Sequence, residues 1–400
     1  MNRLLHSTFL GLAAMLSVGL AKAQLVNNGQ VIFVNTAAVL SVQDNYIHQS
    51  GSILLNGELI ISQNWINNDI AVPVFNTVST GTARFTGTDI RIEGPGITQF
   101  PVLAFQNAGN ATLYVNTEAR RALALDAKKV FTQKNTLSLL NPEVTSLTRN
   151  GGYVVTEGQG SLLRNTAVAD EYLFPLGAAD GNRYAPLVIQ PSDNQANVYG
   201  VSLEYHNPDR DGYNRQLKRD ELQNINENYY YTLIQPSGTS ASEVSLYGNS
   251  ANGRFNMVAR WIDNRVWEKA GQARMLTGAF GSGLDQVFVF NTPALGLLLN
   301  PVTLANGINA ASPFTFFNAF SPDGDGKNDS WEIKNIDAYP DNDLQIFDRS
   351  GNRVYAASSY TKAKSWDGGT QTSGTFYYVL RANIDGINKT FKGFITMVKR

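Results

Sequence analysis

The chain has 400 residues and a formal net charge of -1, from 32 basic and 33 acidic residues, and this length suits about two to four domains. Without a basic excess, no nucleic-acid partner is expected. The absence of cysteine excludes disulfides, thiolate metal sites and a lipoprotein anchor. Only 16% of residues are charged, whereas glycine numbers 35 and asparagine 40, which favours turn-rich β structure over helix.

The N-terminal segment has the pattern of a cleavable secretory signal. Arg3 is followed by an apolar run at 9–20 and a small-x-small triplet at 21–23, just before Gln24. A membrane-spanning helix needs about 20 apolar residues, and the later apolar tract at 287–304 is interrupted by asparagine and proline. We therefore predict a signal peptide at 1–23 and no transmembrane segment.

Residues 24–165 repeat short apolar or β-branched runs that end in asparagine or glycine, most clearly at 51–68, 107–116 and 135–142. This pattern predicts short strands with frequent corners. Asparagine suits such corners because it tolerates left-handed backbone and hydrogen-bonds its own turn. Strands of this kind stack as rungs of a β-solenoid or pair in an ordinary β-sandwich, and no strict period decides between the two.

Residues 166–300 carry longer alternating strands, which predict a middle β-sandwich. A charged connector at 206–228 is expected to be a loop or a short helix. The small residues at 301–313 predict a linker, and a last unit covers 314–400. The expected fold is therefore all-β throughout.

Few residues suggest catalysis. His48 and His206 are far apart in sequence and neither has a second histidine at metal spacing, so a zinc enzyme or a Ser-His-Asp hydrolase is not expected. Alternation places Asp89, Arg91 and Glu93 on one side of a strand, where a polysaccharide-degrading solenoid would hold acidic groups. A solvated strand face explains the same pattern, and we expect no enzyme.

Two features suggest binding. Trp261 and Trp267, among basic residues, would stack on sugar rings or else pack in the core. The loop at 323–329, with sequence DGDGKND, places Asp323, Asp325 and Asp329 as oxygen ligands for Ca²⁺, like the start of an EF-hand loop. The match is partial because Lys334 stands where such a loop has its last glutamate. A hydrogen-bonded Asx turn is the alternative, and no other cofactor is expected.

The last unit contains eight blocks of aromatic, glycine and turn residues in a fixed order. The blocks are 320–329, 331–333, 339–342, 344–347, 348–355, 366–368, 374–380 and 392–399. Their motif residues are Pro322, Gly324, Gly326, Asn328, Trp331, Gly351, Asn352, Tyr355, Trp366, Asp367, Gly368, Gly374, Tyr377 and Gly393. In these blocks the unit resembles the gliding-motility-associated C-terminal domain, the type B sorting domain of the type IX secretion system on secreted surface proteins of the Bacteroidota type. Ser350, and the lack of a proline before Gly374, depart from the family pattern without breaking its strand and turn order.

The resemblance implies an Ig-like β-sandwich of about seven strands and export through the type IX translocon with a partner outer-membrane protein. The implied location is the cell surface or the medium, with outer-membrane association. The expected function is that of an adhesin or surface component linked to attachment or gliding, with a polysaccharide or protein ligand. The alternatives are an accessory structural part of the secretion or gliding machinery, and an extracellular polysaccharide-degrading enzyme.

Overall fold

The computed structural model describes residues 24–181, 183–263, 265–274, 283–296, 300–307, 313–384 and 387–399. The expected signal peptide at 1–23 lies outside these ranges. Within them the chain forms strands β1 to β32 and five short 3-10 helices, so the all-β prediction is confirmed. No helix in the described ranges is long and apolar enough to cross a membrane.

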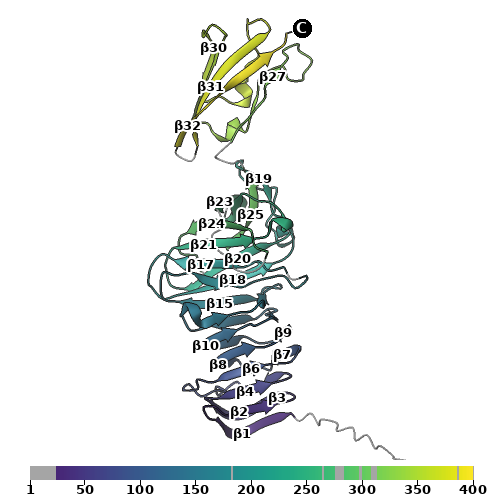
Figure 1. Ribbon diagram of the computed structural model, residues 1–400, viewed down its shortest axis with the longest axis vertical. Coiled ribbons are helices and arrows are strands. Elements are labelled where there is room, and N and C mark those ends of the chain that lie inside the picture. The colour runs from purple at the N-terminus through teal and green to yellow at the C-terminus, as the bar shows by residue number, and fades with distance from the viewer. Residues whose placement is uncertain are drawn as a thin grey trace, which may run out of the picture.

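Residues 25–166 wind as a β-solenoid whose two parallel sheets take alternate strands of the chain (Figure 1). Strands about one coil apart pair in parallel, as at Tyr46 and Trp65 and at Leu59 and Ala83. Sheet A contains seven strands: β1 (Leu25–Val34), β3 (Tyr46–Leu55), β5 (Trp65–Asn67), β7 (Asp89–Glu93), β9 (Gly109–Leu113), β11 (Lys128–Phe131) and β14 (Tyr153–Val155). The solenoid prediction is therefore confirmed for this region, and the sandwich alternative is wrong.

Sheet B forms the opposite wall. Its solenoid strands are β2 (Val39–Val42), β4 (Glu58–Ile61), β6 (Thr82–Phe85), β8 (Thr98–Phe105), β10 (Thr117–Ala124), β12 (Thr136–Leu139) and β15 (Ser161–Thr166), with β13 (Leu147–Thr148) paired to β10 after η1 (Val144–Ser146). Alternate residues of each strand face the interior, because successive side chains point to opposite faces of a sheet. The interior is therefore a continuous apolar core.

An aromatic cluster fills the core of the first coils. The Trp65 ring lies 4.4 Å from that of Tyr46, 5.5 Å from Phe75 and 5.1 Å from Phe100, between ring centroids. Its Nε1 donates to the hydroxyl of Thr98 at 2.9 Å, so the buried indole N–H has a partner. Rings from successive coils thus tie the first coils to one another.

Asparagines lie at the corners, where some hydrogen-bond their own turn as predicted and others bond to a neighbouring coil. The Asn45 side chain accepts from the backbone N–H of Asn64 at 3.1 Å, one coil later, and the Asn64 side chain accepts from that of Arg91 at 2.9 Å. Of the solenoid asparagines within the described ranges, Asn107 alone has a left-handed backbone, with φ 67°. The corner asparagines therefore hold neighbouring coils together.

The C-terminal end of the solenoid is covered by the segment that follows it. Strand β15 pairs antiparallel with β18 (Asn197–Glu204), and Val154 of β14 forms a bridge with Leu176. A Cβ on Gly177 would lie 2.5 Å from the ring of Tyr153, so this close approach requires glycine. At the other end, the described pairings of β1 and β2 are those with β3 and β4.

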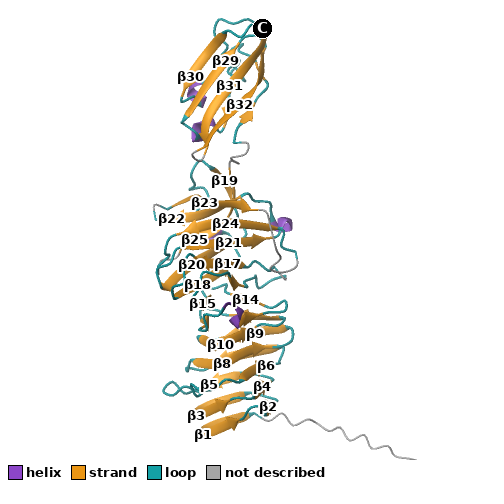
Figure 2. Ribbon diagram, turned by 60° about the vertical axis from the view of Figure 1, so that its left-hand side comes forward, coloured by secondary structure: helices purple, strands orange, loops and turns teal. Residues whose placement is uncertain are grey.

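The middle unit is antiparallel and continues sheet B without a break (Figure 2). Its pairings run in the order β16–β17–β21–β24–β23–β22–β25–β20–β18. The strands are β16 (Tyr172–Phe174), β17 (Leu187–Pro191), β20 (Tyr230–Ser237), β21 (Ser242–Gly248), β22 (Met257–Ile262), β23 (Val266–Arg274), β24 (Gln286–Thr292) and β25 (Asn300–Gly307), with η3 (Ser250–Asn252) before β22. The all-β unit is present, and its description as a sandwich stays a prediction.

Two connecting segments differ from expectation. The connector at 206–228 contains a short 3-10 helix, η2 (Pro208–Asp211), and also a strand, β19 (Leu222–Ile225), paired with β25. The linker prediction was wrong for residues 301–307, which belong to β25 and include buried Leu304 and Ala305. Small residues here reflect close packing, since a Cβ on Gly307 would lie 2.3 Å from the sulfur of Met257. Residues 308–312 lie outside the described ranges.

The C-terminal unit has its own hydrophobic core and lies at the end of the molecule opposite β1 (Figure 1). A five-stranded sheet has the order β27-β32-β31-β29-β30, and β26 pairs with β28. The elements are β26 (Thr315–Phe316), β27 (Ala319–Phe320), β28 (Ile333–Lys334), β29 (Asn342–Phe347), β30 (Arg353–Ser358), β31 (Gly374–Ile384) and β32 (Ile387–Met397), with η4 (Ile336–Ala338) and η5 (Lys362–Lys364). The predicted hairpin turn at 350–352 joins β29 to β30, with Gly351 at φ 84°. The Ig-like sandwich arrangement stays a prediction.

Candidate functional site

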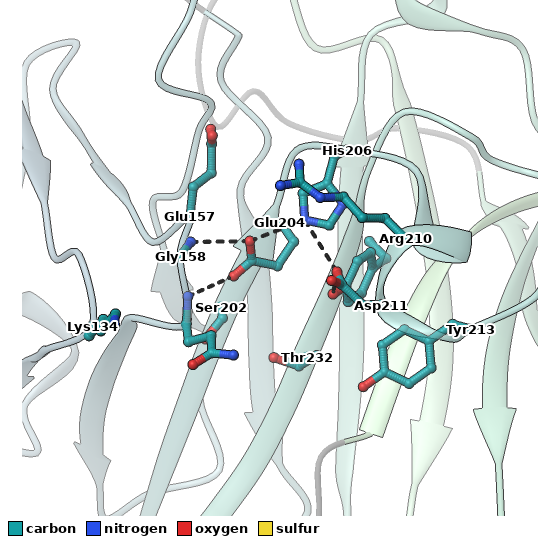
Figure 3. A pocket seen from close by; sticks show the side chains of 12 residues that line it. Lys134, Glu157, Gly158, Ser202, Glu204, His206, Arg210, Asp211, Tyr213 and Thr232 are labelled. Atoms are coloured by element: carbon teal, nitrogen blue, oxygen red, sulfur yellow. Dashed lines mark hydrogen bonds and ion pairs between the residues drawn. The ribbon is translucent and has the colours of Figure 1, made fainter.

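A polar cavity of about 950 Å³ lies where the last solenoid coil meets the middle unit (Figure 3). One wall comes from the loops after β11 and β14, and the other from β18, η2 and β20. Acidic, basic and tyrosine side chains all contribute to it. The lining residues are Lys134, Glu157, Gly158, Gln159, Ser202, Glu204, His206, Arg210, Asp211, Tyr213, Tyr230 and Thr232.

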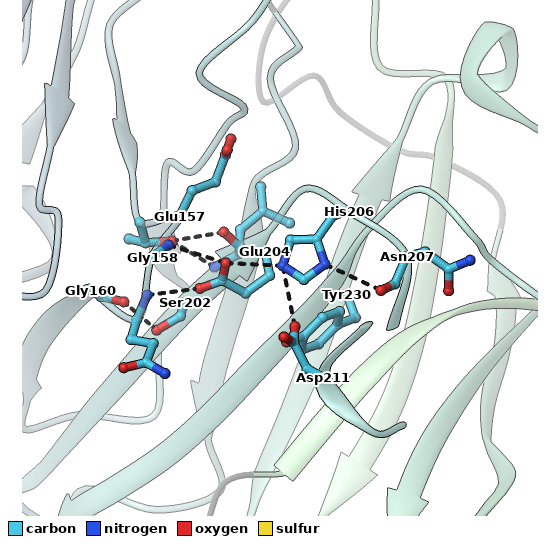
Figure 4. A network of polar contacts seen from close by, with 12 residues as sticks. Glu157, Gly158, Gly160, Ser202, Glu204, His206, Asn207, Asp211 and Tyr230 are labelled. Carbon is cyan, nitrogen blue, oxygen red and sulfur yellow. Dashed lines mark hydrogen bonds and ion pairs between the residues drawn. The ribbon is translucent and has the colours of Figure 1, made fainter. Parts of the chain in front are cut away.

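Glu204 joins the two walls. Its carboxylate accepts from the backbone N–H of Gly158 at 3.2 Å and from that of Gln159 at 3.1 Å. Gly158 and Gln159 both have a left-handed backbone, with φ of 90° and 76°, and this loop conformation turns both N–H groups towards the carboxylate (Figure 4). Glu204 is only 9% exposed, and this burial raises the pKa of its carboxyl group, against the lowering effect of the two amides and of His206.

His206 lies between two carboxylates. Its Nε2 is 3.5 Å from Glu204 Oε2 and 3.2 Å from Asp211 Oδ2, while Nδ1 is 3.2 Å from the carbonyl oxygen of Asn207 (Figure 4). All three oxygens are hydrogen-bond acceptors, and both ring nitrogens lie within 3.5 Å of at least one of them. The ring therefore links the end of β18 to η2.

η2 positions Asp211 through its end groups. The Asn207 side chain accepts from the backbone N–H of Asp209, Pro208 occupies the first helical position, and Gly212 ends the turn at φ 88°. The Tyr230 hydroxyl donates to Asp211 at 2.5 Å. Burial and this hydrogen bond raise the pKa of Tyr230 well above its usual range. Asp211 is thus a fixed acceptor on the cavity wall.

The cavity suits the binding of a polar molecule. Carboxylates, amides and guanidinium groups match ligand hydroxyls, and tyrosine rings offer faces for sugar C–H groups. The Ser202 hydroxyl donates to the carbonyl of Gly160 at 2.6 Å.

Sequence reasoning placed His206 on a surface loop and missed this cluster. One signal was available, because Glu204 and His206 are two residues apart at the end of a strand and therefore share a face. Asp211 reaches them only because η2 turns the chain back. The opposite wall comes from a loop about 45 residues earlier, which the sequence alone does not indicate.

The other predicted sites in residues 24–307, the solenoid and middle unit that together form the passenger region, are separate from this cavity. Asp89 and Arg91 are exposed on the outer face of sheet A, with Glu93 half-buried, as alternation predicts. Asp89 and Arg91, but not Glu93, line a hollow of about 460 Å³ that also includes Tyr114. Trp267 is fully buried and donates to the carbonyl of Tyr213. Of the two predicted alternatives, core packing therefore holds for Trp267. Trp261 is half-buried, with its ring centroid 5.5 Å from that of Trp267, and sugar stacking by Trp261 stays a prediction.

The predicted calcium loop brings its three carboxylates together. Ligand atoms of Asp323, Asp325 and Asp329 lie within 4.8 Å of one another. The Asp329 carboxylate accepts from the backbone N–H of Gly324 at 2.6 Å and from that of Gly326 at 2.8 Å. Both glycines have a left-handed backbone. The predicted Asx-type turn is present, and calcium binding stays a prediction.

Three of the motif residues of the last unit, Trp331, Trp366 and Gly368, pack in its interior. Trp331 and Trp366 are buried and form a bridge, and the indole of Trp331 donates to the carbonyl of Phe317 at 2.6 Å. A Cβ on Gly368 would lie 2.2 Å from the sulfur of Met397. The remaining motif residues lie in turns (Pro322, Gly324, Gly326, Asn328, Gly351, Asn352 and Asp367), in strands (Tyr355, Gly374 and Gly393), or, in the case of Tyr377, on an exposed face of the sheet.

The passenger region is thus a β-solenoid covered by an antiparallel β unit, and a separate β unit follows it. That last unit, residues 314–397, matches the CHU_C type IX secretion signal domain family. The match implies a secreted protein that is exported by type IX secretion to the cell surface or medium, which confirms the predicted sorting domain. No curated protein matches the chain. No solved structure matches it.

Proposed function

We propose that the protein is a surface-displayed adhesin that binds polysaccharide through its solenoid and middle unit, in attachment or gliding. The observation that supports this proposal is a type IX signal domain at 314–397 on a chain with a polar cavity at the end of a solenoid. The middle unit lies between this cavity and the signal unit, and the solenoid extends beyond the cavity on the other side (Figure 1). The ligand is a saccharide, whose hydroxyls meet Asp211 and Arg210 in this cavity.

Export is tested with a fusion of residues 1–23, a fluorescent protein and residues 302–400, expressed in a host with type IX secretion. The exported fraction is expected to require the translocon. Retention in the periplasm would contradict sorting by this unit alone. Stable co-purification of the whole protein with an outer-membrane complex, in place of surface display or release, would favour the alternative role in the secretion or gliding machinery.

Binding is tested with purified residues 24–400 against soluble fragments of cellulose, chitin, pectin and alginate. Asp211→Asn keeps an acceptor for Tyr230 but removes the charge, and is expected to weaken binding about tenfold. Arg349→Ala, an exposed change in the last unit, is the matched control. Equal binding by both variants, or no binding to any fragment, would contradict the proposal.

We further propose that the protein binds these polymers without cleaving them. No reducing ends are expected to be released from the same panel over time. Turnover that is lost in Asp89→Asn or Glu93→Gln would instead support the polysaccharide-degrading alternative.

A further inference from the structure

The outer face of the C-terminal sheet carries a row of three aromatic side chains on adjacent strands. Phe347 of β29 lies opposite Tyr377 of β31, and Tyr377 lies opposite Phe394 of β32. Tyr377 is 49% exposed and Phe394 52%, and Phe347 is half-buried. Directly opposed residues share a face, with their Cβ atoms about 4.5–5.5 Å apart, so the three side chains form one row across the sheet.

The neighbouring residues show that this row is not part of the core. Ile346, Tyr378 and Ile395, each one residue away in the chain from a member of the row, are buried, because successive strand residues face opposite sides. Four large apolar residues of the described C-terminal unit are exposed: Phe317, Tyr377, Phe394 and Val398. Two of these four are direct cross-strand neighbours, which makes the row the densest apolar feature of this surface.

Basic groups accompany the row on the same face. Beside it is a hollow of about 610 Å³ lined by Asp343, Gln345, Phe347, Val379, Arg381, Thr390 and Lys392. Arg381 and Lys392 are exposed, so cations outnumber anions among these lining residues. A complementary surface would therefore be apolar with acidic groups beside it.

The match of this unit to a type IX secretion signal domain implies that the secretion machinery contacts it. A sorting signal is recognised through its exposed side chains, whereas the buried tryptophans and close-packed glycines of the motif only maintain the fold. Among the motif residues predicted from the sequence, Tyr377 is the one with a large exposed apolar side chain. Recognition through aromatic anchors is common at protein interfaces.

We propose that the row Phe347–Tyr377–Phe394, with Arg381 and Lys392 beside it, is the surface by which an outer-membrane component of the type IX machinery recognises this protein. The partner surface is an apolar patch flanked by carboxylates. This inference rests on the proposed function, since it needs export through that machinery. It goes beyond export by identifying the face of the sorting unit that is recognised and the kinds of side chains that recognise it.

The test compares full-length variants in a host with type IX secretion, by the fraction of protein outside the outer membrane. The double variant Tyr377→Thr, Phe394→Thr keeps strand propensity and is expected to lower the exported fraction about tenfold or more. Tyr377→Phe keeps the ring and should be exported like the wild type. Tyr114→Thr, which removes an equally exposed ring from the solenoid, is the matched control.

A second variant distinguishes a loss of recognition from a loss of folding. Lys392→Glu reverses an exposed charge and is expected to reduce export without changing the thermal midpoint of the purified protein. Wild-type export of the double variant and of Lys392→Glu would overturn the proposal while leaving type IX export intact. Failure of the wild-type protein itself to be exported would instead refute the proposed function. A dimer of the purified wild type that is lost in the double variant would also overturn the proposal, because a second copy would then cover the row.

Discussion

Replacing Trp65 with alanine should destabilise the solenoid locally. The ring is fully buried among Tyr46, Phe75 and Phe100. Burial of an aromatic side chain removes about 150–250 Å² of its surface from water. At about 25 cal/mol per Å², this area corresponds to a stabilisation of about 4–6 kcal/mol. Measured losses for Trp→Ala in cores are about 3–5 kcal/mol, because the site partly collapses. We expect a loss of about 4 kcal/mol.

The assay is native-state hydrogen exchange on residues 24–400, followed by peptides from β3, β5 and β7. Protection should fall in these strands and stay unchanged in β29 to β32, because the C-terminal unit has a separate core. Trp65→Phe is the control, and it loses the hydrogen bond to Thr98. That hydroxyl still accepts from the Asn67 side chain at 3.2 Å, so a loss of about 1 kcal/mol is expected.

A loss below about 1 kcal/mol for Trp65→Ala would refute the reasoning, since it would mean that the ring does not tie the coils together. An equal loss of protection in the C-terminal unit would refute it as well. Solenoids are stabilised mainly by contacts between neighbouring coils, and the effect should therefore weaken with distance from Trp65.

Three further outcomes are expected. Burial lowers the pKa of His48 below its ordinary value of 6.5, so the unfolded chain binds a proton first as pH falls below about 6.5. The free energy of unfolding of the first coils should therefore fall below about pH 6.5 and stay level above it. Asp325→Ala should lower the thermal midpoint of residues 302–400 in calcium and abolish the effect of EDTA. Gly177→Ala should cost about 1–3 kcal/mol in urea unfolding, because its Cβ meets the ring of Tyr153.

Each of these outcomes has a control. His48→Gln should remove the pH dependence of exchange, and an unchanged dependence would show that another group causes it. A wild-type midpoint that does not respond to chelator would exclude a role for calcium in stability. A Cβ at Gly212 would meet open space, but the backbone there has a φ of 88°. A comparable loss of stability in Gly212→Ala would therefore point to backbone strain. A loss of stability confined to Gly177→Ala would point to crowding against Tyr153.

The sequence was informative where local pattern decides structure. The run at 51–68 contains the second half of β3, all of β4 and β5, and two corners, because alternating burial and turn residues act over only a few positions. The C-terminal unit was recognisable because its tryptophans, glycines and turns occur in a fixed order. Both are short-range signals.

The rest depends on contacts between distant residues. The asparagine corners looked like isolated turns, but Asn64 bonds to a residue 27 positions later. Residues 301–307 looked like a linker, because small residues in a crowded strand and in a flexible linker have the same composition. The junction cavity needs the solenoid to end and the middle unit to fold back on it, which no local pattern specifies.

Because the solenoid is built from repeated coils, its length can change without a change in the residues that line the cavity. Adjacent strands are about 4.8 Å apart, so the seven strands of sheet A span about 29 Å between the first and the last. Adding or removing one coil near β3 would lengthen or shorten the molecule by about 4.8 Å and leave the junction with β18 untouched. The cavity would keep its distance from the sorting unit while the N-terminal tip moved, so the length of such a protein is free to vary independently of what it binds.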